Sequence, residues 1–160
     1  MQNIGFIGQR YATQEHDYPH ELLVNFFKKL LTERDVGQLV VSSGAGTDLA
    51  MIEAALHMGI DTEIVVPFSD HTERWPVQMA ELYENVANGA RKTVLRSEYA
   101  RGVYDLRNRY ITNTAQDALW IFWDGRNDYA MGGVLAMASA PGAVHVIENV
   151  AGVWAERRGQ

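Results

Sequence analysis

The sequence contains no cysteine, which excludes a disulfide framework and every metal site built on thiolates. This absence fits a reducing compartment. Its five histidines show neither an HExxH motif nor any comparable ligand spacing. We therefore expect no built-in metal and no resident cofactor.

Long hydrophobic runs are also lacking. The first apolar run, residues 4–7, follows Met1 without the basic region or the small-residue cleavage site of a signal peptide. No apolar stretch approaches the length of a membrane span. These features predict a cytoplasmic protein with no membrane partner.

Runs of Lys or Arg are missing, and the formal net charge is −6. A chain of this charge is a poor general surface for nucleic acids or anionic membranes, although single basic residues can still hold a small anion. We accordingly expect no long nucleic acid among the partners.

What the sequence does contain is enough apolar material for one core. Of its 160 residues, 47% are hydrophobic, and neither a repeat nor a linker interrupts them. We expect one domain over residues 1–154 and a C-terminal tail, residues 155–160, that frays.

Short apolar segments alternate with segments of helical period. The expected strands cover residues 3–7, 38–41, 63–66, 93–95, 118–123 and 143–147. The expected helices cover residues 22–31, 49–56, 79–86, 103–114 and 133–140. This alternation predicts an α/β fold, a Rossmann-like open and mostly parallel sheet with helices on both faces.

Polar and glycine-rich segments follow several of these strands. Ligands of such sheets bind at the carboxyl ends of the strands, so these segments are the candidate site. The residues that we expect to contact a ligand are Gly8, Gln9, Arg10, Ser42, Ser43, Gly44, Ala45, Gly46, Thr47, Asp48, Pro67, Arg107, Asn108, Asp124, Gly125, Gly132 and Gly133.

The segment 42–48 offers the strongest local pattern. Its glycines let the backbone approach a ligand, and the following helix start offers free N–H groups to a phosphate. It matches neither the Walker pattern nor the full dinucleotide fingerprint. A structural turn in which Thr47 or Asp48 caps the helix explains it equally well.

The other candidates also have structural alternatives. Arg10 could bind a phosphate or form a surface salt bridge, and Arg107 with Asn108 could be an ordinary exposed pair. The long polar loop 124–133 is typical of binding loops. For Trp120 and Trp123 we favour packing over ligand contact.

Taken together, these segments resemble the SLOG superfamily. This Rossmann-like group includes the cytokinin-activating LOG proteins, DNA-processing protein A and the YpsA-like proteins of unknown function. The similarity rests on residues 4–10, the 42–48 loop, Pro67-Phe68, the Ser97 to Tyr99 segment, Arg107-Asn108, and Asp124-Gly125 leading to Gly132-Gly133. Their order is most similar to that of YpsA-like members.

The resemblance implies a site for nucleotides and a homodimer. LOG enzymes cleave an N-glycosidic bond with an arginine, which Arg107 resembles, and with a glutamate after a Gly-Gly-x-Gly-Thr motif. Residues 131–137 lack that threonine and any carboxylate. Loss of general acid or base help costs about 10²- to 10⁴-fold in rate, which disfavours this hydrolysis. A substitute carboxylate could come from Asp48, Glu53, Asp124 or Asp128.

The preferred hypothesis is therefore a protein that senses or sequesters a nucleotide, including NAD-derived or cyclic ones, without turnover. One alternative is an N-glycoside hydrolase or transferase that uses Arg107 with Asp48 or Asp124. The second alternative is an interaction module that binds no ligand.

Overall fold

The computed structural model describes residues 1–8, 20–123, 144–150 and 153–158. In chain order its elements are β1 (Gln2–Gly8), α1 (His20–Glu33), β2 (Val36–Ser42), α2 (Thr47–His57), β3 (Asp61–Phe68), α3 (Val77–Val86), β4 (Arg91–Arg96), α4 (Val103–Thr114), β5 (Ala118–Trp123), β6 (Val144–Val150) and β7 (Val153–Arg158).

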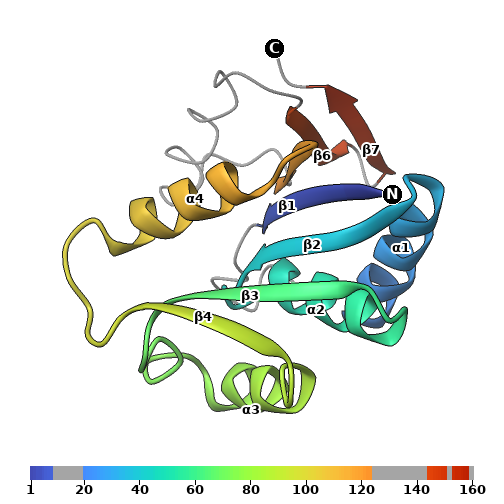
Figure 1. The fold of residues 1–160 in the computed structure, drawn as a ribbon. Helices are drawn as coiled ribbons and strands as arrows, with labels where there is room; N and C mark the ends of the chain where they lie inside the picture. The colour runs from blue at the N-terminus through green and yellow to red at the C-terminus, as the bar shows by residue number, and fades with distance from the viewer. Residues whose placement is uncertain (9–19, 124–143, 151–152, 159–160) are drawn as a thin grey trace.

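The strands form one sheet in the order β4-β3-β2-β1-β5-β6-β7. All neighbouring strands are parallel except β7, which pairs antiparallel with β6. Helices α1, α2 and α3 cover one face and α4 lies over the other (Figure 1). The expected α/β class, with an open, mostly parallel sheet between helices, is thus confirmed.

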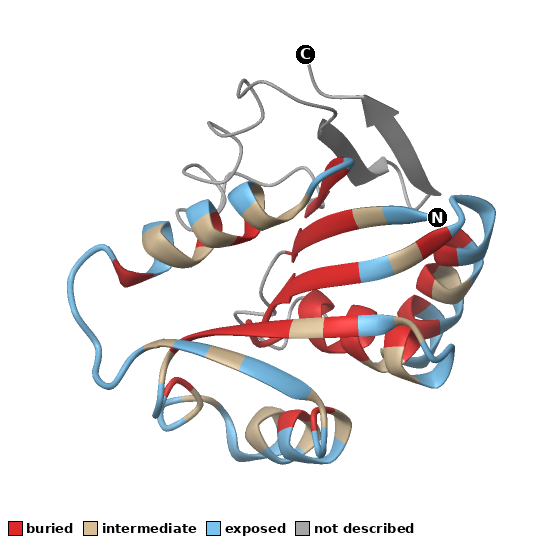
Figure 2. Ribbon diagram, in the orientation of Figure 1, coloured by how far each residue is buried: buried red, intermediate tan, exposed pale blue. Residues whose placement is uncertain are grey.

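Buried residues are concentrated in the central strands and in the helices that cover them (Figure 2). The side chains of these strands alternate between the two faces of the sheet and build a core on each. On the side of α1 and α2, the Phe27 ring packs edge-on against Phe6 at 5.3 Å and against Phe122 at 5.2 Å between centroids. On the side of α4, Ile111 packs with Ile7 and other strand residues. Each fully buried side chain of this size contributes about 1.5–3 kcal/mol.

Helix α1 shows the expected amphipathic pattern with one exception. Leu23, Phe27, Leu30 and Leu31 are buried, whereas Leu22 is 66% exposed. The four-residue spacing of the leucine and phenylalanine residues in 22–31 predicts Leu22 on the same apolar face. It lies one position too early, and at 100° per residue it turns out of the stripe.

Most expected elements are present with similar bounds. Residues 103–114 and 118–123 match α4 and β5 at both ends, and Trp120 is buried as expected. The expected helix 133–140 lies outside the described residues. Strand β7 was not expected, and it includes residues on both sides of the proposed boundary between the domain and its tail. The division into a domain and a tail stays a prediction. In the described part, no helix is long and apolar enough to cross a membrane.

Candidate functional site

The carboxyl ends of the first three strands bring several predicted residues together. β1 ends at Gly8, β2 at Ser42 and β3 at Phe68, and α4 packs on the same three strands from the other layer. The chain order of the strands reverses beside β1, which is where ligands of such sheets bind. The topology therefore brings these predicted residues together at one edge of the sheet.

Asp48 occupies the centre of the predicted anion loop. Its side chain is 1% exposed and accepts hydrogen bonds from the N–H of Gly8 and the N–H of Gly44, both at 2.8 Å. The Ser42 hydroxyl donates to the same carboxylate. The Gly44 N–H of the predicted anion loop is thus bonded to a carboxylate of the protein itself, which places a negative group where a phosphate was expected.

The start of α2 also differs from both readings of the sequence. Gly46 is the N-cap, with φ of 133°, and no side chain caps the helix. Thr47 and Asp48 lie in the first turn instead. The cap expected from Thr47 or Asp48 is therefore wrong: glycine is needed at this φ, and Asp48 bonds sideways to β1 and to the loop.

The end of β1 lies unusually close to α2. A Cβ atom on Gly8 would sit 1.9 Å from Thr47 Oγ1 and 3.0 Å from Asp48 Oδ1. Ser42, Ser43 and Thr47 are all fully buried here, and the Ser43 hydroxyl donates to the Val65 carbonyl at 3.0 Å. The glycine loop is a closed, internally bonded junction.

Burial raises the pKa of Asp48 from 3.8 to about 6. The Ser42 hydroxyl, the positive charge of Arg107, and the N–H groups of Gly44 and Gly8 act in the opposite direction. Desolvation penalises the charged form more than these partners stabilise it. The field of Arg107 reaches this carboxylate, which links α4 to the loop.

Arg107 is held on α4 by its neighbours. Its Nε and Nη2 atoms both donate to Oδ1 of the buried Asn108, at 3.1 and 3.0 Å. Its guanidinium carbon lies 5.3 Å from the centre of the Tyr104 ring. Stacking over Tyr104 leaves a half-buried guanidinium whose orientation is fixed.

Three aromatic rings gather beside this guanidinium. Phe68 packs edge-on against Tyr99 at 5.7 Å and against Tyr104 at 6.2 Å, and the two tyrosine rings are 6.3 Å apart. Tyr99 is 64% exposed and Tyr104 is 39% exposed. We call Phe68, Tyr99, Tyr104 and Arg107 the aromatic–arginine cluster.

The sequence around this cluster is basic although the chain is acidic. Residues 91–110 hold six of the 14 Lys and Arg residues and only two of the 20 Asp and Glu residues. Arg96 and Arg101 within it are exposed. Sequence reasoning missed Tyr104 as a site residue, although this local charge and the spacing of Tyr104 and Arg107 on one helix could have indicated it.

The structure separates the predicted site residues into three groups. Gly8, Ser42, Ser43, Gly44, Ala45, Gly46, Thr47 and Asp48 form the closed junction, and Pro67 is buried in β3. Arg107 and Asn108 lie at the junction of α4 with the aromatic rings. Gln9, Arg10, Asp124, Gly125, Gly132 and Gly133 lie outside the described residues. In the described part of the chain, no group of three or more His, Asp or Glu side chains could hold a metal ion.

No protein-family model matches the chain, and no curated protein matches it. Solved structures of similar fold include two of DNA processing protein A. One is DNA processing protein A from Helicobacter pylori, described for its single-stranded DNA binding mode, with a TM-score of 0.60, 17% identity, 92% of this chain and 66% of that chain covered. The other is DNA processing protein A from Streptococcus pneumoniae, with a TM-score of 0.50, 16% identity, 89% of this chain and 58% of that chain covered.

These neighbours have the SLOG-like Rossmann fold, so the resemblance is confirmed at the level of the fold. This chain spans less than two thirds of the length of either protein. They support neither a YpsA-like nor a LOG-like assignment.

Two functional expectations need correction. A neighbour described as binding single-stranded DNA contradicts both the small-nucleotide sensor and the exclusion of a long nucleic acid partner. The geometry gives a physical reason, because Asp48 occupies the loop that was to hold a phosphate. The alternatives, an N-glycosidase and a non-binding module, are no better supported. The net charge of the whole chain also does not reveal that the segment 91–110 is locally basic.

Proposed function

We propose that this chain binds single-stranded nucleic acid, and that the aromatic–arginine cluster at the carboxyl end of β3 is its contact surface. The observation that carries the proposal is the pair of exposed tyrosine rings, Tyr99 and Tyr104, beside the fixed guanidinium of Arg107. The description of a structural neighbour as a single-stranded DNA binding protein supports it.

The chemistry of the cluster suits an unpaired strand. Bases stack on exposed aromatic rings regardless of sequence, with about 1–3 kcal/mol per base, and arginine binds the phosphates between them. In a duplex the base faces are already stacked on one another, so exposed rings gain little there. The cluster should therefore discriminate in favour of single strands.

Electrostatics supports the same surface. The basic segment 91–110 attracts phosphates locally, while the acidic remainder of the chain repels a strand that approaches elsewhere. Binding of this kind should be weak over most of the protein and concentrated at one edge of the sheet. It should also fall steeply as salt is added.

In this proposal the closed loop is a structural element that does not contact the nucleic acid. Asp48, Gly8 and Gly44 hold the strand ends together, and the field of Arg107 reaches the same carboxylate. The loop thus frames the surface without contacting the strand. A closer relationship to YpsA-like proteins, a homodimer and a cytoplasmic location stay predictions.

The direct test is fluorescence anisotropy with a labelled oligothymidylate of about 20 nucleotides, which spans one to several typical single-strand sites. We expect binding at low salt, weaker binding to a duplex of equal length, and a loss of affinity with added salt. Arg107→Ala should reduce affinity about tenfold. It should also lower the slope of log affinity against log salt concentration by about one, which corresponds to the loss of one phosphate contact. Lys29→Ala, which removes an exposed cation on α1, is the control.

Two outcomes would overturn the proposal. One is the absence of binding to the oligothymidylate at low salt. The other is equal binding of single strand and duplex, since that would indicate contact with phosphates alone.

A further inference from the structure

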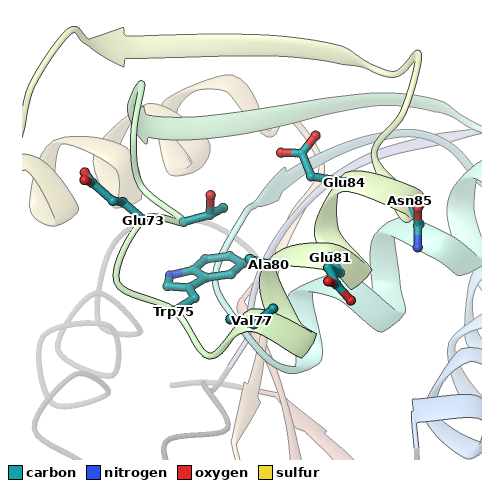
Figure 3. A pocket seen from close by; sticks show the side chains of 8 residues that line it. Glu73, Trp75, Val77, Ala80, Glu81, Glu84 and Asn85 are labelled. Carbon is teal, nitrogen blue, oxygen red and sulfur yellow. The ribbon is translucent and has the colours of Figure 1, made fainter.

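A concave surface lies on the layer of α1–α3, whereas the aromatic–arginine cluster involves α4 on the other layer. We call it the α3 groove; it has a volume of about 530 Å³ (Figure 3). Its lining residues are Thr72, Glu73, Trp75, Val77, Ala80, Glu81, Glu84 and Asn85. The five that belong to α3 recur every three or four residues, which places them on one face of the helix.

The groove is acidic without compensation. Glu73, Glu81 and Glu84 line it, and no Lys, Arg or His does so. Within the described residues, none of these three carboxylates forms a hydrogen bond or an ion pair. Glu81 and Glu84 stand three residues apart on the helix, where like charges destabilise it. A cation bound between them would relieve this repulsion.

One wall of the groove is an aromatic ring whose position is fixed. Trp75 is half-buried and packs edge-on against His71 at 5.2 Å and against the buried Tyr83 at 5.8 Å. Figure 3 shows it beside Val77 and Ala80 at the start of α3. An indole face attracts cations, and Val77, 71% exposed, offers apolar surface to an aliphatic stem.

We infer that the α3 groove binds an arginine side chain carried by an extended basic segment of a partner protein. A guanidinium is planar, so it can stack on Trp75 and donate two parallel hydrogen bonds to one carboxylate, a geometry that the tetrahedral ammonium of lysine lacks. The volume exceeds that of one guanidinium and suits a short segment around it. Three carboxylates repel phosphates, so this partner differs from the one proposed for the aromatic–arginine cluster.

The test uses the full chain, without nucleic acid, and the peptide acetyl-Gly-Arg-Gly-Arg-Gly-amide in a calorimetric titration. Its neutral counterpart carries citrulline in place of each arginine. We expect the arginine peptide to bind, the citrulline peptide to bind at least about tenfold more weakly, and Glu81→Gln/Glu84→Gln to lose about tenfold in affinity. This double variant removes a repulsion and should fold, which circular dichroism checks. Glu21→Gln, an exposed change on α1, should bind like the parent chain.

Three results would overturn the inference. The arginine peptide could fail to bind at millimolar concentration, or it could bind the double variant as tightly as the parent chain. The third is a change in oligomeric state of the peptide-free double variant by light scattering, since the occupant would then be a second copy of this chain.

Discussion

Two strand ends that lie side by side in the sheet differ in almost every property. At the end of β2 the polar groups are buried and bonded to Asp48, whereas at the end of β3 the tyrosine rings are exposed and only partly packed. A buried, satisfied polar network stabilises a fold, and exposed aromatic surface next to a cation is typical of binding. Glycine-rich sequence thus marks the scaffold here, and the surface proposed to bind lies one strand further along.

Of the changes that test this difference, removal of the Asp48 carboxylate should have the largest effect, because it lowers the stability of the buried strand end. Asp48→Ala leaves the N–H of Gly8, the N–H of Gly44 and the Ser42 hydroxyl without their acceptor in a buried place. We expect a loss of about 4 kcal/mol in the free energy of unfolding, measured by urea denaturation. Asp117→Ala is the matched control, because Asp117 accepts the Asn3 N–H in an exposed place. Equal losses in the two variants would contradict a buried junction.

The same carboxylate should make stability depend on pH. Its pKa is about 6 in the folded chain and 3.8 in the unfolded chain, so the folded state holds the proton more tightly. Its contribution is fully present below about pH 4 and is lost as the pH rises through about 6. The loss amounts to about 3 kcal/mol.

The measurement compares unfolding free energies of the parent chain and Asp48→Asn from pH 4 to pH 8. The difference between the two curves isolates Asp48 from other titrating groups. Curves that stay parallel across this range would show that the carboxyl is not desolvated as its burial implies.

Gly8→Ala should have the next largest effect. The new Cβ would overlap Thr47 Oγ1, so the buried Thr47 side chain or the backbone around it must shift, at a cost of about 2 kcal/mol. Gly89→Asn tests glycine replacement where no atom lies within 4 Å and where the left-handed backbone tolerates asparagine. We expect its loss, measured by the same urea unfolding, to be under about 1 kcal/mol. A well-tolerated Gly8→Ala would mean that the junction is looser than described.

The smallest effect on stability is expected at the exposed tyrosine rings near the end of β3. Tyr99→Ala should leave stability nearly unchanged and weaken binding of an oligothymidylate about tenfold, since one stacking surface is lost. Tyr99→Phe keeps the ring and should bind like the parent chain. Anisotropy titrations of both variants decide whether the ring or the hydroxyl matters. Unchanged binding in Tyr99→Ala would remove this ring from the proposed surface.

The sequence predicted the fold better than the site. Apolar periodicity located α4 and β5 at both ends, because long-range packing there agrees with the local pattern. The role of Asp48 could not be predicted, since its partner Gly8 lies 40 residues away and either an anion or a side chain can satisfy the same N–H groups. The ring contact between Phe68 and Tyr104 joins β3 to α4 at the edge of the sheet. Sequence periodicity describes residues within one helix or strand, so it could not predict this contact between two elements.

The central place of β1 has a consequence for the order in which the fold can form. β1 pairs with β2 on one side and with β5 on the other, and its Asn3 N–H bonds to Asp117, 114 residues away. A chain that emerges from the ribosome can therefore pair β1 with β2 early, but the other side of β1 stays open until β5 is made. Contacts of such long sequence separation are slow to form. Until then the apolar side chains of β1 lie at an open sheet edge, the state in which a nascent chain is most prone to aggregate.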